Sequence, residues 1–334
     1  MKNKSILITG NAGLIGSRLA TWILDNHPEY EVVGIDNLFC GYMENVDRRV
    51  VFYKRDLSID PISDIFDKHN FEYVYHFAAY AAEGLSPFMR KFNYSNNILS
   101  TVNVINECIN HNVSRLIYTS SMSVYGWGLK KGVLFNEDDR PEPIDPYAIS
   151  KYACEMDIKV AGEQHGLDWC IIRPHNCYSE NQNIWDKYRN VLGIWMYQTL
   201  NNMPMLIYGD GEQTRAFSYV DDCLEPLWNA AISNKASKEI INLGGEVAYT
   251  INEAAKTLCS ITGYDNIEYR EERHEVKYAV PSNEKAKRLL DYKQTTPLQT
   301  GLLNMWEWAK NQPQRMQYKW EKYEIEKGLY SYWK

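Results

Sequence analysis

A tyrosine and a lysine stand four residues apart, at Tyr147 and Lys151, and Ser121 follows an apolar run upstream of them. Residues four apart on a helix share a face, so we expect the Lys151 ammonium to lie close to the Tyr147 phenol. A nearby positive charge lowers the pKa of a tyrosine from its ordinary value of about 10 and favours the phenolate, which is a base. The spacing therefore suits proton transfer from a hydroxyl group. On the spacing alone, an ordinary helix with a solvated lysine is the alternative.

A glycine-rich turn, Gly10-Asn11-Ala12-Gly13-Leu14-Ile15-Gly16, follows the first apolar run. Glycines permit a tight turn and let a diphosphate approach the N-terminus of a helix. Asp36 stands 20 residues after Gly16, where a carboxylate binds the ribose hydroxyls of adenosine and disfavours a 2′-phosphate. The sequence therefore predicts a dinucleotide site that prefers NAD to NADP. Asp56 either accepts a hydrogen bond from the adenine amine or caps a helix.

Short β-rich runs alternate with helical stretches in the first half of the chain, which predicts an α/β fold with a Rossmann-type, doubly wound parallel sheet. The expected helices contain Leu14 to Ile23, Ile98 to Ile109 and Tyr147–Val160. The expected strands are Ser5–Thr9, Glu31–Asp36, Val50–Lys54, Tyr73–Phe77, Arg115–Thr119 and Asp168–Arg173.

After Arg173 the rhythm changes to segments rich in Asn, Tyr, Trp and Gly, with short apolar runs at Met205–Tyr208 and Ile240–Leu243. We interpret these segments as a smaller, discontinuous C-terminal lobe that covers the carboxyl ends of the strands, where ligands bind in such sheets. We place the dinucleotide-binding domain at residues 1–174 plus about 217–247 and the substrate lobe at 175–216 plus 248–334. The aromatic, charged tail Gln312–Lys334 is expected to be a packed terminal segment.

The composition of the chain argues against several classes of protein. The 334 residues carry a formal net charge of −7, which gives no reason to expect nucleic acid as a partner. The sequence contains no run of about 18 apolar residues, so no membrane span is predicted. The first apolar run is too short for a signal peptide. The seven cysteines are scattered without a Cys-x-x-Cys pair, which argues against disulfides and a zinc site. We expect a cytoplasmic protein without a bound metal.

The motifs stand in the order found in one family. The chain resembles the extended short-chain dehydrogenase/reductase superfamily, and within it the nucleotide-sugar epimerases of the UDP-glucose 4-epimerase type, from about residue 4 to about 310. The resemblance rests on the glycine turn, Asp36-Asn37-Leu38, Asp56-Leu57, His76-Phe77-Ala78-Ala79, Asn97 opening a helix, Ser120-Ser121, Tyr147 with Lys151, Arg173-Pro174-His175-Asn176 and Gly209-Asp210-Gly211-Glu212-Gln213-Thr214-Arg215.

The resemblance implies NAD as cofactor and a UDP-sugar or another nucleotide-sugar as substrate. Tyr147 would be the acid/base, Lys151 its electrostatic partner and a ligand of the nicotinamide ribose, and Ser121 the partner of the reacting sugar hydroxyl. Asn176 and Arg215 would hold the diphosphate, since an arginine fork suits phosphate oxygens. The implied cofactor contacts are Gly10, Gly13, Leu14, Ile15, Gly16, Asp36, Asn37, Asp56, Leu57, Phe77, Ala78, Ala79, Asn97, Tyr147, Lys151 and Pro174. The implied substrate contacts are Ser121, Ser123, Tyr147, Asn176, Asn190, Val191, Arg215 and Arg273.

Several positions depart from the family pattern. Related 4,6-dehydratases carry acidic residues where this chain has Met122 and Ser123, which points away from dehydration. A lysine of some epimerases is replaced by the neutral Tyr80-Ala81-Ala82. The family's Arg-x-Gly-Asp/Glu reads Glu272-Arg273-His274-Glu275, which displaces the arginine by one residue. Alanine at the expected gating position, Ala279, suggests room for an N-acetylated sugar.

Together these residues predict an NAD-dependent nucleotide-sugar 4-epimerase, an isomerase that works through a transient 4-keto sugar. The alternatives are an epimerase acting at C2 or on uronic acids, a nucleotide-sugar reductase or dehydratase, and a non-enzymatic NAD sensor, which has no need of Ser121, Tyr147 and Lys151. A homodimer is expected, because the helices containing Asn97–Ile109 and Tyr147–Val160 form a dimer bundle in the resembling family.

Overall fold

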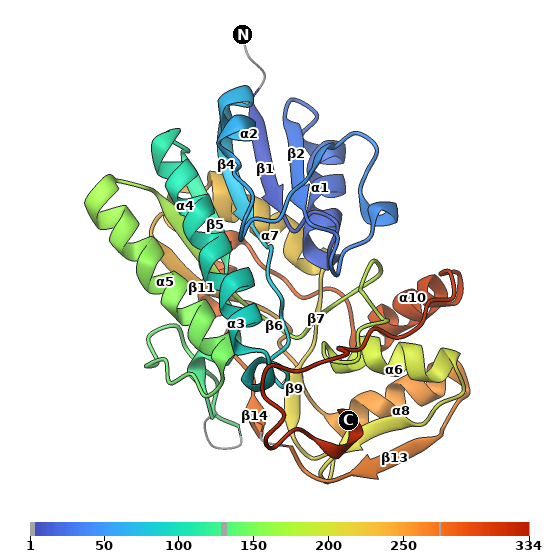
Figure 1. Ribbon diagram of the computed structural model, residues 1–334. Helices are drawn as coiled ribbons and strands as arrows, with labels where there is room; N and C mark the ends of the chain where they lie inside the picture. The colour runs from blue at the N-terminus through green and yellow to red at the C-terminus, as the bar shows by residue number, and fades with distance from the viewer. Residues whose placement is uncertain (1–3, 128–131, 274, 334) are drawn as a thin grey trace.

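The computed structural model describes residues 4–127, 132–273 and 275–333 (Figure 1). Seven parallel strands form its main sheet in the order β11-β6-β5-β4-β1-β2-β3. The strands are β1 Ser5–Thr9, β2 Glu31–Asp36, β3 Val51–Lys54, β4 Phe71–His76, β5 Arg115–Thr119, β6 Trp169–His175 and β11 Glu239–Gly244. The predicted doubly wound parallel sheet is therefore confirmed, and each of the six predicted strands falls within two residues of an observed one.

Helices cover both faces of this sheet. One core packs the sheet against α1 (Leu14–Asn26), α7 (Asp221–Ile232) and α9 (Glu284–Leu290). The other packs it against α2 (Ser63–Lys68), α4 (Ser100–Asn110) and α5 (Pro146–His165). Successive residues of β1 serve the two cores alternately, Ile6 and Ile8 on one face and Leu7 on the other. Strands buried on both faces are apolar along their whole length, which made them visible in the sequence.

One apolar run lies elsewhere than expected. Ile240–Leu243, which we interpreted as part of the smaller lobe, belongs to β11 and pairs with β6 at the edge of the main sheet. That interpretation is wrong, although the run falls within the returning segment 217–247. The composition of the run indicates a buried strand. It does not indicate the strand with which the run pairs, because that pairing depends on the path of the chain between β6 and β11.

Smaller sheets and helices lie beyond the carboxyl ends of the main strands (Figure 1). Their own core gathers around Trp195, Phe217 and Met305. Thr250 and Glu253 form a reciprocal capping box at the start of α8. The elements are β7 Cys177–Tyr178 with β10 Ser218–Tyr219; β8 Met205–Tyr208 with β13 Ile267–Arg270; β9 Thr214–Ala216 with β12 Ala248–Thr250 and β14 Tyr278–Ala279; and helices α6 Val191–Leu200, α8 Ile251–Thr262 and α10 Leu298–Lys310.

The C-terminal tail returns from α10 toward α3 (Arg90–Tyr94), drawn in red in Figure 1. The Glu324 carboxylate accepts the backbone N–H groups of Lys91 at 2.7 Å and Phe92 at 2.8 Å. The tail also shares an aromatic core with Phe88 and Tyr188. The prediction of a packed terminal segment is confirmed. Within the described ranges, no helix is long and apolar enough to cross a membrane.

Candidate functional site

A cavity of about 910 Å³ lies at the carboxyl ends of the main-sheet strands, beside the smaller sheets. Its wall contains all the substrate contacts predicted from the sequence, and all the predicted cofactor contacts except Asn97. Residues as distant in the chain as Gly10 and Arg273 therefore meet in one space. No group of three or more His, Cys, Asp or Glu side chains in the described part of the chain could hold a metal ion.

The glycine turn brings backbone close to this cavity. Gly10 has a φ of +70°, and a β-carbon there would lie 2.8 Å from the backbone nitrogen of Ala78. A β-carbon on Gly16 would collide with the carbonyl oxygen of Gly10. The first turn of α1, at Leu14 and Ile15, lines the cavity with N–H groups that lack partners within the helix. With the helix dipole, this end of α1 fits a diphosphate.

Asp36 ends β2, and backbone N–H groups hold both of its carboxylate oxygens. Oδ2 accepts from Ala12 at 3.1 Å and Oδ1 from Leu38 at 2.8 Å. Burial raises the pKa of this carboxyl. Each oxygen still has acceptor capacity for a hydroxyl group. The position and chemistry of Asp36 therefore fit the ribose of a dinucleotide.

Asp56 stabilises a turn after β3. Its Oδ1 accepts from the Ser58 hydroxyl at 2.6 Å and the Ser58 N–H at 2.9 Å, and its Oδ2 accepts from Asn37 at 3.1 Å. Burial opposes ionisation, but these hydrogen bonds lower the pKa of Asp56. Helix α2 begins later, at Ser63. The alternative that Asp56 caps a helix is therefore wrong.

Asn97 does not open a helix and does not line the cavity. It lies in a π-helical turn, Ser95–Leu99, that joins α3 to α4, and it is buried. Its Oδ1 accepts the Tyr80 N–H at 2.9 Å, and its Nδ2 donates to Asn93 at 2.9 Å and Ser150 at 3.3 Å. Both expectations for Asn97 are corrected: its amide fixes the segment after Ala79 instead of facing the cofactor space.

Helix α5 positions Tyr147 and Lys151. The helix begins after Asp145, whose Oδ1 accepts the Ala148 N–H at 2.9 Å. Lys151 Nζ donates to the carbonyl oxygen of Thr119 at 2.7 Å and lies 6.0 Å from the centroid of the Tyr147 ring. Burial lowers the pKa of Lys151 to about 8. The predicted shared face is confirmed, but the ammonium bonds to the end of β5.

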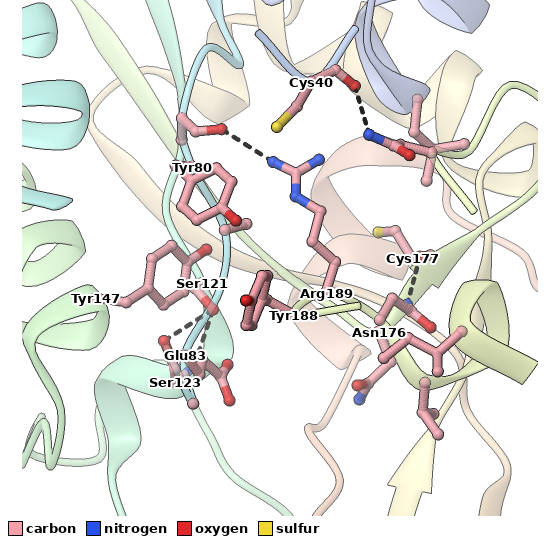
Figure 2. Close-up of a pocket in the computed structure, with 18 of the residues that line it drawn as sticks. Cys40, Tyr80, Glu83, Ser121, Ser123, Tyr147, Asn176, Cys177, Tyr188 and Arg189 are labelled. Atoms are coloured by element: carbon pink, nitrogen blue, oxygen red, sulfur yellow. Dashed lines mark hydrogen bonds between the residues drawn. The ribbon is translucent and has the colours of Figure 1, made fainter. Parts of the chain in front are cut away.

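The Tyr147 phenol stands beside the Ser121 hydroxyl in the wall of the cavity (Figure 2). Burial raises the pKa of Tyr147, the negative charge of Glu83 raises it further, and a hydrogen bond with Ser121 and the charge of Arg189 act in the opposite direction. In the chain by itself, burial outweighs the nearby positive charges, so the pKa of Tyr147 lies above its ordinary value.

Arg189 is a cavity residue that the sequence analysis missed. Its guanidinium lies near Cys40 and Tyr80 (Figure 2) and donates from Nη2 to the carbonyl oxygen of Ala79 at 3.3 Å. Its charge opposes the burial that raises the pKa values of Asp36 and Tyr147. A cation from the segment before α6 thus faces the cofactor side of the cavity. The one sequence signal for this cation was the neutral segment Tyr80-Ala81-Ala82. It stands where some epimerases carry a lysine, so the positive charge had to come from another segment.

Glu83 is the second residue that was missed. Its side chain opens into the cavity near Ser121 and Ser123 (Figure 2). Desolvation by the surrounding walls and the negative charge of Asp145 raise the pKa of Glu83, and the positive charge of Arg215 acts against them. Met122 and Ser123 are not acidic, but the cavity still contains a carboxyl beside them. The carboxyl comes from a different loop.

Two arginines face the far end of the cavity. The Arg215 guanidinium pairs with Glu275, with Nη2 and Oε2 3.3 Å apart. The Arg273 guanidinium lies 3.3 Å from the centroid of the Tyr208 ring, and its Nε donates to the Tyr332 hydroxyl at 2.7 Å. The displaced arginine motif therefore still delivers Arg273 to the cavity wall; His274 of the same motif lies outside the described residues.

The backbone shapes this end as well. Asn176 lies between β6 and β7 with a φ of +42°, a conformation that Asn tolerates better than most residues. Asn190 caps α6, because its Oδ1 accepts the Leu192 N–H at 2.9 Å. Ala279 is buried in β14 and does not line the cavity, whereas Val276 does. The expectation that Ala279 enlarges a gate is therefore wrong.

The tail completes the wall with aromatic rings. Tyr330, Tyr332 and Trp333 all line the cavity. Trp333 lies near Gly84, since a β-carbon on that glycine would be 3.6 Å from the indole ring. Nothing in the tail's composition indicated this position, because its partners come from residues 80–92, 188, 208 and 273.

Known proteins share this architecture. A putative UDP-glucose 4-epimerase of Methanocaldococcus jannaschii is 28% identical over 309 residues, which is 92% of this chain and 98% of that protein. The crystal structure of UDP-glucose 4-epimerase from Thermotoga maritima with UDP-glucose matches with a TM-score of 0.85 and 31% identity, covering 91% of this chain and 98% of its own. UDP-glucuronic acid 4-epimerase from Bacillus cereus with UDP-glucuronic acid and NAD matches with a TM-score of 0.83 and 29% identity, covering 92% and 99%.

The family model described as "NAD dependent epimerase/dehydratase family" matches residues 6–244, more than half of the chain. This range contains the glycine turn, Asp36, Ser121, Tyr147 and Lys151, all of which lie in the wall of the one cavity. The cofactor predicted from the glycine turn and Asp36 is the one in the family's description. The chain belongs to the NAD dependent epimerase/dehydratase family.

Proposed function

We propose that this protein is a nucleotide-sugar 4-epimerase of the UDP-glucose/UDP-galactose type, with its dinucleotide-binding domain at 1–174 plus about 217–247. One observation carries the proposal: a single cavity contains the glycine turn and Asp36, the Ser121–Tyr147 pair, and Arg215 with Arg273. A dinucleotide and a nucleotide-sugar can therefore meet at one phenol.

The chain fits NAD through its own geometry. The turn at Gly10 and Gly16 leaves no room for a β-carbon, and Asp36 keeps acceptor capacity for ribose hydroxyls. When bound, NAD would accept the hydride of the sugar C4 and return it. Arg189 and Lys151 would supply positive charge along the same side of the cavity. Lys151 has three donors, so the bond to Thr119 leaves it able to bind a ribose hydroxyl.

Tyr147 would move the proton. Its phenolate would take the proton of the sugar 4-hydroxyl, while the Ser121 hydroxyl orients that group. The 4-keto sugar would then turn about its link to the diphosphate and take back hydride and proton on the other face. Such rotation needs few sugar contacts and a firm hold on the nucleotide, which Asn176, Arg215 and Arg273 would supply.

The charges around the sugar position favour a neutral sugar. Glu83 and Asp145 line the cavity beside the phenol, and the negative charge of each raises the pKa of Tyr147. A carboxylate at C6 of the substrate would add a like charge beside them, which is unfavourable. A uronic acid is therefore a poorer substrate in this proposal than UDP-glucose, UDP-galactose or their N-acetylated forms.

The reaction is tested by incubating the purified protein with UDP-glucose, UDP-N-acetylglucosamine and UDP-glucuronic acid without added cofactor, and identifying the products by NMR. We expect interconversion of gluco and galacto forms, fastest for a neutral sugar. Net consumption of added NADH would instead indicate a reductase, and a 4-keto-6-deoxy product a dehydratase. Tyr147→Phe should lose at least about 100-fold in kcat and retain NAD, whereas Tyr152→Phe on the same helix serves as the matched control.

The expected homodimer also belongs to this proposal. Helix α5 and the turn before α4 carry large apolar side chains on the surface, Leu99, Ile149, Met156 and Val160. Ile149, Met156 and Val160 follow helical spacing, so they lie along one side of α5. Burying this side against a second copy would remove it from water.

A further inference from the structure

Glu83 is held in fixed relation to Tyr147 by one buried hydroxyl. The Ser86 hydroxyl donates to the Glu83 carbonyl oxygen at 2.8 Å, or to Asp145 Oδ1 at 3.2 Å, and accepts the backbone N–H of Tyr147 at 3.1 Å. Ser86 is buried. The loop that carries Glu83 is therefore fastened to the first turn of α5, which carries the phenol.

The Glu83 carboxyl faces the space where the sugar would react. It lies near Ser121 and Ser123 in Figure 2, and its negative charge raises the pKa of the Tyr147 phenol. Its side chain stays open to the cavity, so it can exchange protons with water. With a pKa raised above its ordinary value, Glu83 would take and return a proton more readily near neutral pH than a free carboxyl.

We propose that Glu83 is a second acid/base of this site, which exchanges the proton on a sugar carbon next to C4 while the sugar is in its 4-keto form. This rests on the proposed function, because the 4-epimerase reaction is what produces the ketone. Neither C4 inversion nor hydride transfer needs this step, so it is an additional activity of the same cavity.

The chemistry balances without a further reagent. The Glu83 carboxylate takes the proton from C3 or C5, and the electron pair of that C–H bond forms a double bond to C4. The pair of the C4 carbonyl moves to its oxygen, which is stabilised by a hydrogen bond from the Tyr147 hydroxyl. The protonated Glu83 exchanges its proton with water and then returns one to the same carbon.

The outcome is exchange without inversion. Glu83 lies on one side of the sugar position, so a proton that it returns before the sugar turns arrives on the face that lost it. Inversion would require a second acid on the opposite face, or a turn of the sugar between loss and return of the proton. In heavy water, this step therefore incorporates one deuterium at C3 or C5 of the sugar, and the configuration of that carbon is retained.

The test supplies the ketone ready-made, so that it does not depend on the C4 reaction. The full chain as purified is incubated in heavy water with UDP-4-keto-6-deoxy-D-glucose, and deuterium at C3 and C5 is followed by NMR and mass spectrometry. We expect exchange about 100-fold above the protein-free rate. Glu83→Gln should bring it close to that rate, while Glu142→Gln, an exposed glutamate outside the cavity wall, should keep it.

The results separate the two proposals. Exchange at the protein-free rate, or equal exchange in wild type and Glu83→Gln, would overturn this inference even if UDP-glucose is still epimerised at C4. Exchange on the supplied ketone without any C4 interconversion would support the inference and reject the proposed 4-epimerase. Thermal unfolding and NAD content of Glu83→Gln are measured beside these assays, so that a folding defect is recognised.

Discussion

Lys151 Nζ bonds to the carbonyl oxygen of Thr119 at 2.7 Å, while its distance from the centroid of the Tyr147 ring is 6.0 Å. The Lys151 ammonium is thus fixed to the end of β5, and it faces the Tyr147 ring from there. In the proposed reaction, Lys151 would act through the ribose that it would bind and through its positive charge beside the phenol.

The buried lysine makes stability depend on pH. Its pKa in the folded protein is about 8, below the ordinary value of 10.5, so the unfolded chain binds more protons between these values. The contribution of Lys151 to stability therefore rises with pH across this window, by up to about 3 kcal/mol. Urea unfolding at pH 7.5 and pH 10 should show a larger rise for wild type than for Lys151→Met. An equal rise in both proteins would contradict the account; Lys159→Met is the control.

The charge of Glu83 should be visible in the pH profile of the reaction. This charge raises the pKa of Tyr147, so Glu83→Gln lowers it and keeps the phenolate populated at lower pH. We expect the acidic limb of kcat/KM against pH to move down by up to about one unit. An unmoved limb, or one displaced to higher pH, would show that Glu83 does not act on the phenol.

The tail should contribute to binding of the nucleotide-sugar. Tyr332→Phe keeps the ring near Arg273 but removes the acceptor of the Arg273 Nε hydrogen bond. A hydrogen bond to a charged group is worth roughly 1.5–3 kcal/mol, so KM should rise at least about tenfold with kcat little changed. Tyr330→Phe is the control, because the Arg273 Nε–H donates to the hydroxyl of Tyr332. Equal KM values for Tyr332→Phe and Tyr330→Phe would show that this tail contact does not contribute to binding of the nucleotide-sugar.

The exposed side of α5 offers a test of the dimer. Met156→Glu places a charge among Ile149 and Val160, which a second copy would have to bury. We expect wild type to elute as a dimer in size-exclusion chromatography with light scattering, and the variant as a monomer at micromolar concentration. A monomeric wild type would end the dimer proposal.

Local patterns predicted much of this molecule. The buried strands and the glycine turn could be located because their signals lie within a few neighbouring residues. Hydrophobic alternation and backbone constraints act at short range, so Ser5–Thr9, Glu31–Asp36 and Arg115–Thr119 were predicted to the residue.

What could not be predicted depends on contacts between distant segments. Glu83 becomes significant only because Ser86 fastens its loop to α5, and Arg189 because it reaches Ala79 across the cavity. The Lys151 bond to Thr119 depends on the distance between α5 and β5. The tail likewise acquires its position from Arg273, nearly sixty residues earlier in the chain.

The central claim is that the sugar is oxidised and reduced at C4 within one cavity, with Tyr147 moving the proton. The most direct measurement follows UDP-[4-²H]glucose by NMR in ordinary water without added cofactor. The account predicts UDP-galactose with deuterium retained at C4, and none of this product from Tyr147→Phe. Galactose formation with loss of the C4 label to water, or label-retaining turnover by Tyr147→Phe, would contradict it.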